Sequence, residues 1–361
     1  MIGIIGFESL RVMQYLDKYT KIFDEDGIDY EVVYWNRNGI PNFDSRYQAY
    51  NKTMNTYVPF QKKIPLFLGY ASFIYRTILS RRYDQLIVLT TQSAIVLSPL
   101  LLTKYRKKYL FDYRDITFER NRGYRFLVKS LFRHSKGVPI SSLGFLNYLG
   151  KGNKYILSHN CRDLQFIEYD KRKSDKIRIV YWGMVRQVDF NKKICDLFAN
   201  DDRFTLTYHG EGYYKEIEEY CQVQDYKNIL FTGGYERTEM MEFGADTDIL
   251  LNAYENDGQQ QSALTVKLYD GMKYRIPMLV TSGSYMADYL SSWKIAYPIS
   301  VDKAQSKEEI INWFQSLSKN SIQTDFNELK DTMKKDEEVF IQSVRKFYNQ
   351  GKVGWIEEEL G

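Results

Sequence analysis

Cysteine is scarce in this chain, and its three cysteines form no recognisable site. Cys161, Cys195 and Cys221 are odd in number and include neither a CxxC pair nor a Cys/His cluster. The pattern predicts neither a disulfide framework nor a zinc site. The three histidines also lack metal-ligand spacing. We therefore expect no metal site built from these residues, and thiols of this kind suit the reducing cytoplasm.

Long apolar runs are also absent. The longest, IPLFLGYASFIY between Lys63 and Arg76, is too short to span a bilayer. The N-terminal stretch MIGIIGFESLR has no basic region at its start and reaches Arg11 before an apolar run of signal-peptide length can form. We expect a cytoplasmic chain, bound at most to the inner face of a membrane.

Charge of one sign is not in large excess. A net charge of +4 is too small to indicate a nucleic-acid partner. Aromatic residues are plentiful, with 31 Tyr and 21 Phe. This enrichment is typical of carbohydrate or lipid-surface contact, but AT-rich coding sequence also produces it, and we regard that as the commoner cause.

A chain of 361 residues is too long for one hydrophobic core and fits two domains of roughly 150–200 residues. Short β-rich runs alternate with helix-length amphipathic segments, which indicates parallel sheets covered on both faces. The expected strands in the first half are 2–7, 30–35, 85–91, 108–113, 137–141 and 154–159. Those in the second half are 177–183, 204–210, 228–234, 248–254 and 276–282.

The charged stretch EYDKRKSDK interrupts this alternation and is the best candidate for a linker. We therefore expect an α/β chain with two Rossmann-like, doubly wound parallel-sheet domains facing a central cleft. The first covers 1–168, a linker covers 169–176, and the second covers 177–335. A helical segment, 336–361, would return to the first domain.

Ligands of open parallel sheets bind beyond the carboxyl ends of the strands, so the residues that follow each strand are the site candidates. After IVYWG come Arg186 and Lys192, cations at a strand-to-helix junction that suit a diphosphate. The alternative is a solvated basic helix start. After NILF, the pair Gly233 and Gly234 lets a flat ligand approach the backbone, with Tyr235 available to stack. The alternative is an ordinary tight turn.

After DILLNAY, a polar loop leads to a helix expected to begin near Leu264 or Thr265. Lys267 then lies in the first turn, where a cation opposes the helix dipole unless an anion is nearby. Asp270 lies one turn later on the same face. The alternative is an exposed Lys–Asp surface pair, worth only about 0.2–0.5 kcal/mol.

In the first half, Asp112, Arg114 and Asp115 follow the strand KYLFDY. They are expected either to be catalytic groups, which would orient the hydroxyl group of an acceptor substrate, or to form a buried network that holds the loop. Gly6 ends the first strand and is a candidate diphosphate contact. The segment IGIIGFES is not GxGxxG, and no acidic residue ends the second strand, which argues against a dinucleotide.

The stretch KLYDGMKYRIPMLVT resembles the KLxEYMAxGxPVI segment of family 4 glycosyltransferases of the GT-B fold, especially bacterial enzymes that assemble capsule and other surface polysaccharides. IVYWGMVRQ resembles the start of their second domain. By this resemblance Asp270 corresponds to the second glutamate of an E-x7-E motif and would bind the donor ribose. Arg186, Lys192 and Lys267 would hold the donor diphosphate, and residues 233–235 would hold the base.

Two departures from the family pattern concern this motif. Ser262 stands where the first glutamate is expected, and Asp270 is shorter than Glu by one methylene. Glu255 is an alternative carboxylate if the loop is offset. The resemblance implies sugar transfer from a UDP- or GDP-sugar to a glycan or polyprenyl-linked oligosaccharide, retaining and without metal, since no DxD-like element stands out as a Mg²⁺ clamp. Alternatives are a nucleotide-sugar epimerase, for which the three histidines have no suitable setting, and a catalytically silent GT-B partner, favoured by Ser262.

The stretch 57–83 mixes aromatic, aliphatic and basic residues in the first domain. It is expected either to lie on a membrane beside a lipid-linked acceptor or to be a core helix with charged ends.

Overall fold

The computed structural model describes the chain except for residues 14, 55–59, 153, 162–163, 302–306 and 350–361. It divides into two compact units: Met1–Arg162 with Lys335–Gly361, and Asp163–Lys334. The first boundary falls before the predicted linker rather than within it. Residues of that stretch are held by the second unit, because Lys171 pairs with Asp248 (3.0 Å) and Arg172 pairs with Asp246.

Unit 1 contains a parallel sheet in the order β3-β2-β1-β4-β5, which β6 and β7 extend through backbone bridges to β5. Its strands are β1 (Ile2–Ile5), β2 (Tyr30–Trp35), β3 (Tyr47–Tyr50), β4 (Gln85–Leu89), β5 (Tyr109–Asp112), β6 (Val138–Ile140) and β7 (Tyr155–Leu157). Its helices are α1 (Leu16–Asp26), α2 (Phe60–Arg81), α3 (Thr90–Val96), α4 (Ser98–Leu102), α5 (Arg122–His134) and α6 (Leu146–Leu149), with the 3₁₀ turn η1 (Leu143–Phe145).

Unit 2 contains a parallel sheet in the order β10-β9-β8-β11-β12-β13. Its strands are β8 (Ile177–Trp182), β9 (Phe204–His209), β10 (Ile229–Gly233), β11 (Ile249–Asn252), β12 (Met278–Thr281) and β13 (Ala296–Ile299). Its helices are α7 (Val188–Phe198), α8 (Tyr214–Val223), α9 (Met240–Ala245), α10 (Val266–Lys273), α11 (Tyr285–Leu290) and α12 (Lys307–Ser316), with the 3₁₀ turn η2 (Arg237–Glu239). The strand order reverses between β8 and β11, the position where doubly wound sheets bind ligands.

All eleven expected strands are present, and most of them, β1, β4, β5 and β11 above all, carry apolar runs that are buried on both faces of the sheets. The edge strands β3 and β13 were not predicted. Their sequences, YQAY and AYPI, are short and only partly buried, so they carry a weak apolar signal. Pro298 is tolerated in β13 because an edge strand leaves one row of N–H groups unpaired.

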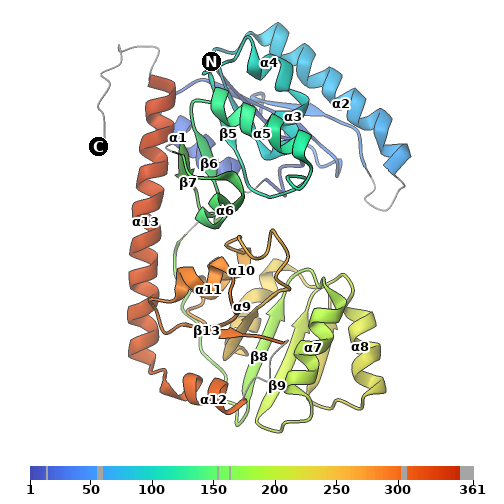
Figure 1. The fold of residues 1–361 in the computed structure, drawn as a ribbon, viewed down its shortest axis with the longest axis vertical. Helices are drawn as coiled ribbons and strands as arrows, with labels where there is room; N and C mark the ends of the chain where they lie inside the picture. The colour runs from blue at the N-terminus through green and yellow to red at the C-terminus, as the bar shows by residue number, and fades with distance from the viewer. Residues whose placement is uncertain (14, 55–59, 153, 162–163, 302–306, 350–361) are drawn as a thin grey trace. The chain divides into compact units, whose positions relative to one another are not determined.

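The long helix α13 (Lys319–Asn349) contains the second boundary between the units. Its C-terminal part packs with α1 over the sheet of unit 1, where Phe340, Val344 and Phe347 join the buried core (Figure 1). Lys18 of α1 forms an ion pair with Glu337 in the same helix. The chain's last described helix therefore contributes to the core of the N-terminal fold.

Helix α2 has a buried stripe formed by Tyr70, Ile74 and Ile78, at a spacing of four residues. Its described part is therefore a core helix of unit 1, as one of the two interpretations expected. Residues 57–59 of the stretch fall outside the described residues. Within the described part of the chain, no helix combines the length and apolarity needed to cross a bilayer.

Replacing Phe340 by Ala is expected to destabilise unit 1 by about 3–5 kcal/mol, because the ring is fully buried against Tyr19. Urea unfolding measures the change. The neighbouring Val339, 56% exposed, provides the control, and Val339→Ala should cost less than about 0.5 kcal/mol. Equal effects of the two substitutions would show that α13 is not part of this core.

Candidate functional site

Three strands of unit 2 end in glycines at the same edge of the sheet. Gly183 follows β8, Gly210 follows β9, and Gly233 ends β10, with φ angles of 122°, 152° and 78°. A Cβ on Gly210 would lie 1.8 Å from the carbonyl oxygen of Gly183. Only glycine fits this approach, so these strand exits present backbone rather than side chains.

Lys267 lies beside this edge, in the first turn of α10, and is buried. Its ammonium is 3.7 Å from the centre of the Tyr181 ring and donates a hydrogen bond to the Tyr254 hydroxyl (2.6 Å). In the described part of the chain Lys267 forms no ion pair. Burial lowers its pKa to about 7, with Arg186 lowering it further and Asp270 opposing. The alternative of an exposed Lys–Asp surface pair is therefore wrong.

Asp270, one turn further along α10, is half-buried and accepts a hydrogen bond from the indole N–H of Trp182 (3.2 Å). Trp182 is the last residue of β8 and is buried. The carboxylate is thereby held at the strand end, close enough to Lys267 to oppose the fall in its pKa. The structure brings Asp270, Lys267 and the exit of β8 together.

Arg186 is exposed in the loop between β8 and α7, and its charge acts on Lys267 and Tyr254. The loop is fixed by the next residue, Gln187, which has a left-handed φ of 57°. The Gln187 amide oxygen accepts a hydrogen bond from the backbone N–H of Glu255 (3.1 Å), and its NH₂ group donates to Asp257 (3.4 Å). These contacts join the loops that follow β8 and β11.

Lys192 is not brought to this cluster. It lies in α7, and its ammonium is 3.6 Å from a carboxylate oxygen of Glu216 and 5.4 Å from the ring centre of Tyr220, both in α8. Among the predicted diphosphate contacts, only Arg186 and Lys267 lie together in unit 2.

The predicted base-binding turn lies at the exit of β10. A Cβ on Gly234 would meet the Glu211 carboxylate at 2.7 Å, so a larger residue would displace that side chain. The ring of Tyr235 contacts Phe243 edge-on, and Phe243 stacks on His209 with ring centres 3.8 Å apart. Burial lowers the pKa of His209 to about 4, so the imidazole is neutral at pH 7. The turn is thus bordered by an uncharged aromatic group.

Ser262 is buried, and its backbone N–H donates to Gln259 (3.0 Å). Glu255 is exposed on the loop after β11. Among the described residues, no group of three or more His, Cys, Asp or Glu side chains is arranged to hold a metal ion.

In unit 1, Asp112 and Arg114 form a buried network at the end of β5. Arg114 donates through Nε and Nη2 to both carboxylate oxygens of Asp112, with 2.8 Å for Nη2. Its Nη1 donates to the backbone oxygen of Ser158 (2.7 Å), and Tyr19 donates to Asp112 (2.6 Å). The contacts are those of the second interpretation, in which these residues hold the loop. Asp115 is exposed.

Gly6 also belongs to unit 1. Its carbonyl oxygen accepts a hydrogen bond from the Tyr70 hydroxyl, and a Cβ would lie 2.3 Å from the sulfur of Met13. A larger residue there would displace the Met13 side chain, so packing alone gives a reason for glycine at this position.

Sequence reasoning missed a second charged group in unit 1, at the exits of β1 and β2. Arg37 lies over the rings of Phe7 (4.9 Å) and Trp35 (4.5 Å) and donates through Nη1 to both oxygens of Glu8 (2.7 Å each). Its buried Nε and Nη2 have no partner among the described residues. The signal that was available is that Glu8 and Arg37 each follow a strand closely, in GFES and YWNRN.

In unit 2, Tyr181, Trp182 and Tyr254 were also missed. Each is an ordinary strand residue by its sequence pattern. Only the structure shows that Tyr181 and Tyr254 enclose Lys267 and that Trp182 contacts Asp270.

No protein-family model matches the chain, and no curated protein matches it in sequence. Solved structures match along nearly its whole length. Sucrose-phosphate synthase from Thermosynechococcus elongatus superposes with a TM-score of 0.71 at 11% identity, over 97% of this chain and 99% of that one. HepE of Anabaena, solved with UDP and glucose, gives 0.63 at 12% identity, over 96% and 98%. WaaG, a glycosyltransferase involved in lipopolysaccharide biosynthesis, gives 0.57 at 10%, over 97% and 95%.

At these identities the likeness establishes the fold. The chain has the GT-B fold of two Rossmann-like domains, which confirms the fold expected from the sequence resemblance.

Replacing Asp112 by Asn is expected to destabilise unit 1 by about 3–5 kcal/mol, because Arg114 would keep a buried charge without its ionic partner. Urea unfolding measures this, with the exposed Asp115→Asn as control. A stable Asp112→Asn variant that nevertheless lost a chemical activity would instead assign Asp112 to catalysis.

Proposed function

We propose that the chain is a glycosyltransferase that moves a sugar from a nucleotide diphosphate sugar, UDP- or GDP-linked, to a hydroxyl group. The observation that carries this proposal is the buried ammonium of Lys267. It lies at the start of a helix and at the switch point of a GT-B donor-side sheet, without a carboxylate partner among the described residues. A buried cation in that setting is stabilised by an anion, and a diphosphate is the anion that this fold brings there.

The proposed chemistry follows from where charge develops. As the glycosidic bond to the donor breaks, the leaving diphosphate gains negative charge, which Lys267 and Arg186 stabilise together with N–H groups at the start of α10. Asp270 accepts hydrogen bonds from the ribose hydroxyls. The base lies on the turn at 233–235, against Tyr235. We propose that the reaction needs no metal and retains the anomeric configuration.

The acceptor is a glycan or a polyprenyl-linked oligosaccharide of bacterial surface polysaccharide, such as capsule. Support comes from two structural neighbours, WaaG and the lipopolysaccharide outer core galactosyltransferase WaaB. We place the reaction in the cytoplasm, on the inner face of the cell membrane.

A second candidate is a catalytically silent GT-B partner, and Ser262 favours it because a serine cannot supply the carboxylate of the family motif. A thermal-shift screen of nucleotide diphosphates identifies the nucleotide that binds. Transfer or hydrolysis of the matching donor sugar supports the enzyme. Binding without any turnover supports the silent partner.

Asp270→Ala and Arg186→Ala are expected to weaken binding of UDP or GDP by about 10- to 150-fold, the loss of a charge-assisted hydrogen bond. Isothermal titration calorimetry measures the affinity. Lys192→Ala is the matched control, because its ammonium contacts Glu216, and it should change the affinity by less than about threefold. Unchanged affinity in the first two variants would refute the site.

Binding of the same nucleotide is expected to weaken by about tenfold for each pH unit above about 7, because Lys267 must be protonated to hold the diphosphate. Lys267→Met should bind weakly without this pH dependence. Calorimetry between pH 6.5 and 9 measures the affinity, and a flat profile for the unmodified chain would exclude Lys267 as a diphosphate contact.

Without nucleotide, Lys267 is protonated in the unfolded chain between about pH 7 and 10 but mostly deprotonated in the folded chain. The free energy of unfolding should therefore rise with pH over this range.

A further inference from the structure

Residues 120–162 contain no Asp or Glu but nine Lys and Arg. The whole chain is nearly balanced, with 50 cationic and 46 acidic residues, so this stretch is a local departure. It includes α5, β6, α6 and β7 of unit 1. A segment this basic, in a chain whose charges are otherwise nearly balanced, favours an anionic partner.

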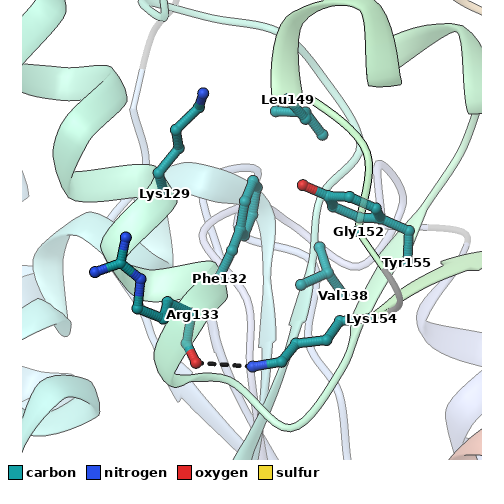
Figure 2. A pocket seen from close by; sticks show the side chains of 8 residues that line it. All are labelled: Lys129, Phe132, Arg133, Val138, Leu149, Gly152, Lys154 and Tyr155. Carbon is teal, nitrogen blue, oxygen red and sulfur yellow. Dashed lines mark hydrogen bonds between the residues drawn. The ribbon is translucent and has the colours of Figure 1, made fainter.

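The same segment forms a pocket of about 270 Å³. Phe132, Val138, Leu149 and Tyr155 give it an apolar lining, and Figure 2 shows the cationic side chains of Lys129, Arg133 and Lys154 around them. The apolar lining offers few hydrogen bonds, so it suits a hydrocarbon body with a charged head rather than a sugar.

The cations of this pocket are not neutralised by the protein. In the described part of the chain, Lys129, Arg133 and Lys154 form no ion pair. Lys154 donates instead to the backbone oxygens of Arg133 (2.7 Å) and Ser135 (3.2 Å), and Lys107 donates to the same Arg133 oxygen (2.8 Å). Burial and then Lys107 lower the pKa of Lys154 to about 8. An anion in the pocket would relieve this repulsion.

The outward face of α5 continues the pocket's chemistry. Arg122, Arg125, Phe126, Lys129 and Arg133 are all exposed, and their spacing places them on one side of the helix. Phe126 is 75% exposed. Phe118, just before the helix, is 68% exposed. A basic helix face with an exposed aromatic ring on it and another just before it is typical of segments that lie in the interface of an anionic bilayer.

We propose that this pocket binds an anionic lipid, with the phosphate headgroup on the cations around the apolar lining, while the outward face of α5 lies on the bilayer surface. The exposed phenylalanines and the apolar lining favour a lipid over an acidic glycan or a free phosphate ester. The proposal adds a partner to the proposed function and does not depend on it. It is tested at residues remote in sequence from the donor site, so nucleotide affinity reports separately on the two.

The test is flotation of the full chain with vesicles of phosphatidylcholine containing about 30% phosphatidylglycerol, against vesicles of phosphatidylcholine alone. We expect binding to the anionic vesicles only. Lys129→Glu with Arg133→Glu should lower the partition coefficient at least tenfold. Lys215→Glu with Lys335→Glu makes the same change of charge at two other exposed positions and should alter it less than threefold.

Phe126→Ser keeps the charge and should lower the partition severalfold, which separates insertion of the ring from attraction alone. Circular dichroism and nucleotide binding confirm that each variant is folded. Equal flotation of the pocket variant and its control would overturn the proposal. So would tight calorimetric binding of soluble glycerol 1-phosphate without flotation, because the partner would then be a free phosphate ester.

Discussion

The buried ammonium of Lys267 is the interaction on which the candidate donor site depends. It lies against the face of Tyr181 and donates to the Tyr254 hydroxyl, so its direct contacts are aromatic rings and one neutral oxygen. Burial keeps its pKa near 7, and an anion bound beside the ammonium would stabilise the charged form. Asp270 and Arg186 lie close enough to affect the same pKa, so the three charges form one electrostatic unit.

The fold places this unit where it is. A parallel sheet with the order 10-9-8-11-12-13 diverges between β8 and β11, and the helix after β11 starts at that point. Glycines at the exits of β8, β9 and β10 remove side chains that would occupy the same edge. Packing on the other side of α10 is also close, since a Cβ on Gly271 would meet the sulfur of Met278 at 2.9 Å. The site is therefore a product of backbone geometry as much as of its charged residues.

Much of the fold could be predicted from the sequence, because buried parallel strands are continuous apolar runs and their exits are marked by Gly and polar residues. The position of Lys267 and Asp270 followed from the same pattern. Side-chain direction could not be predicted in the same way. Lys192 follows β8 as closely as expected, but its position in α7 places its ammonium beside Glu216 of α8. For Asp112 and Arg114 the sequence left two interpretations open, and only the structure shows that the two side chains pair with one another.

A structure of the chain with UDP or GDP bound tests the central claim most directly. The account predicts a diphosphate oxygen within hydrogen-bond distance, about 3 Å, of the Lys267 ammonium, with the ribose hydroxyls on Asp270. A nucleotide bound elsewhere, with Lys267 still enclosed by Tyr181 and Tyr254 and no anion beside it, would contradict the account.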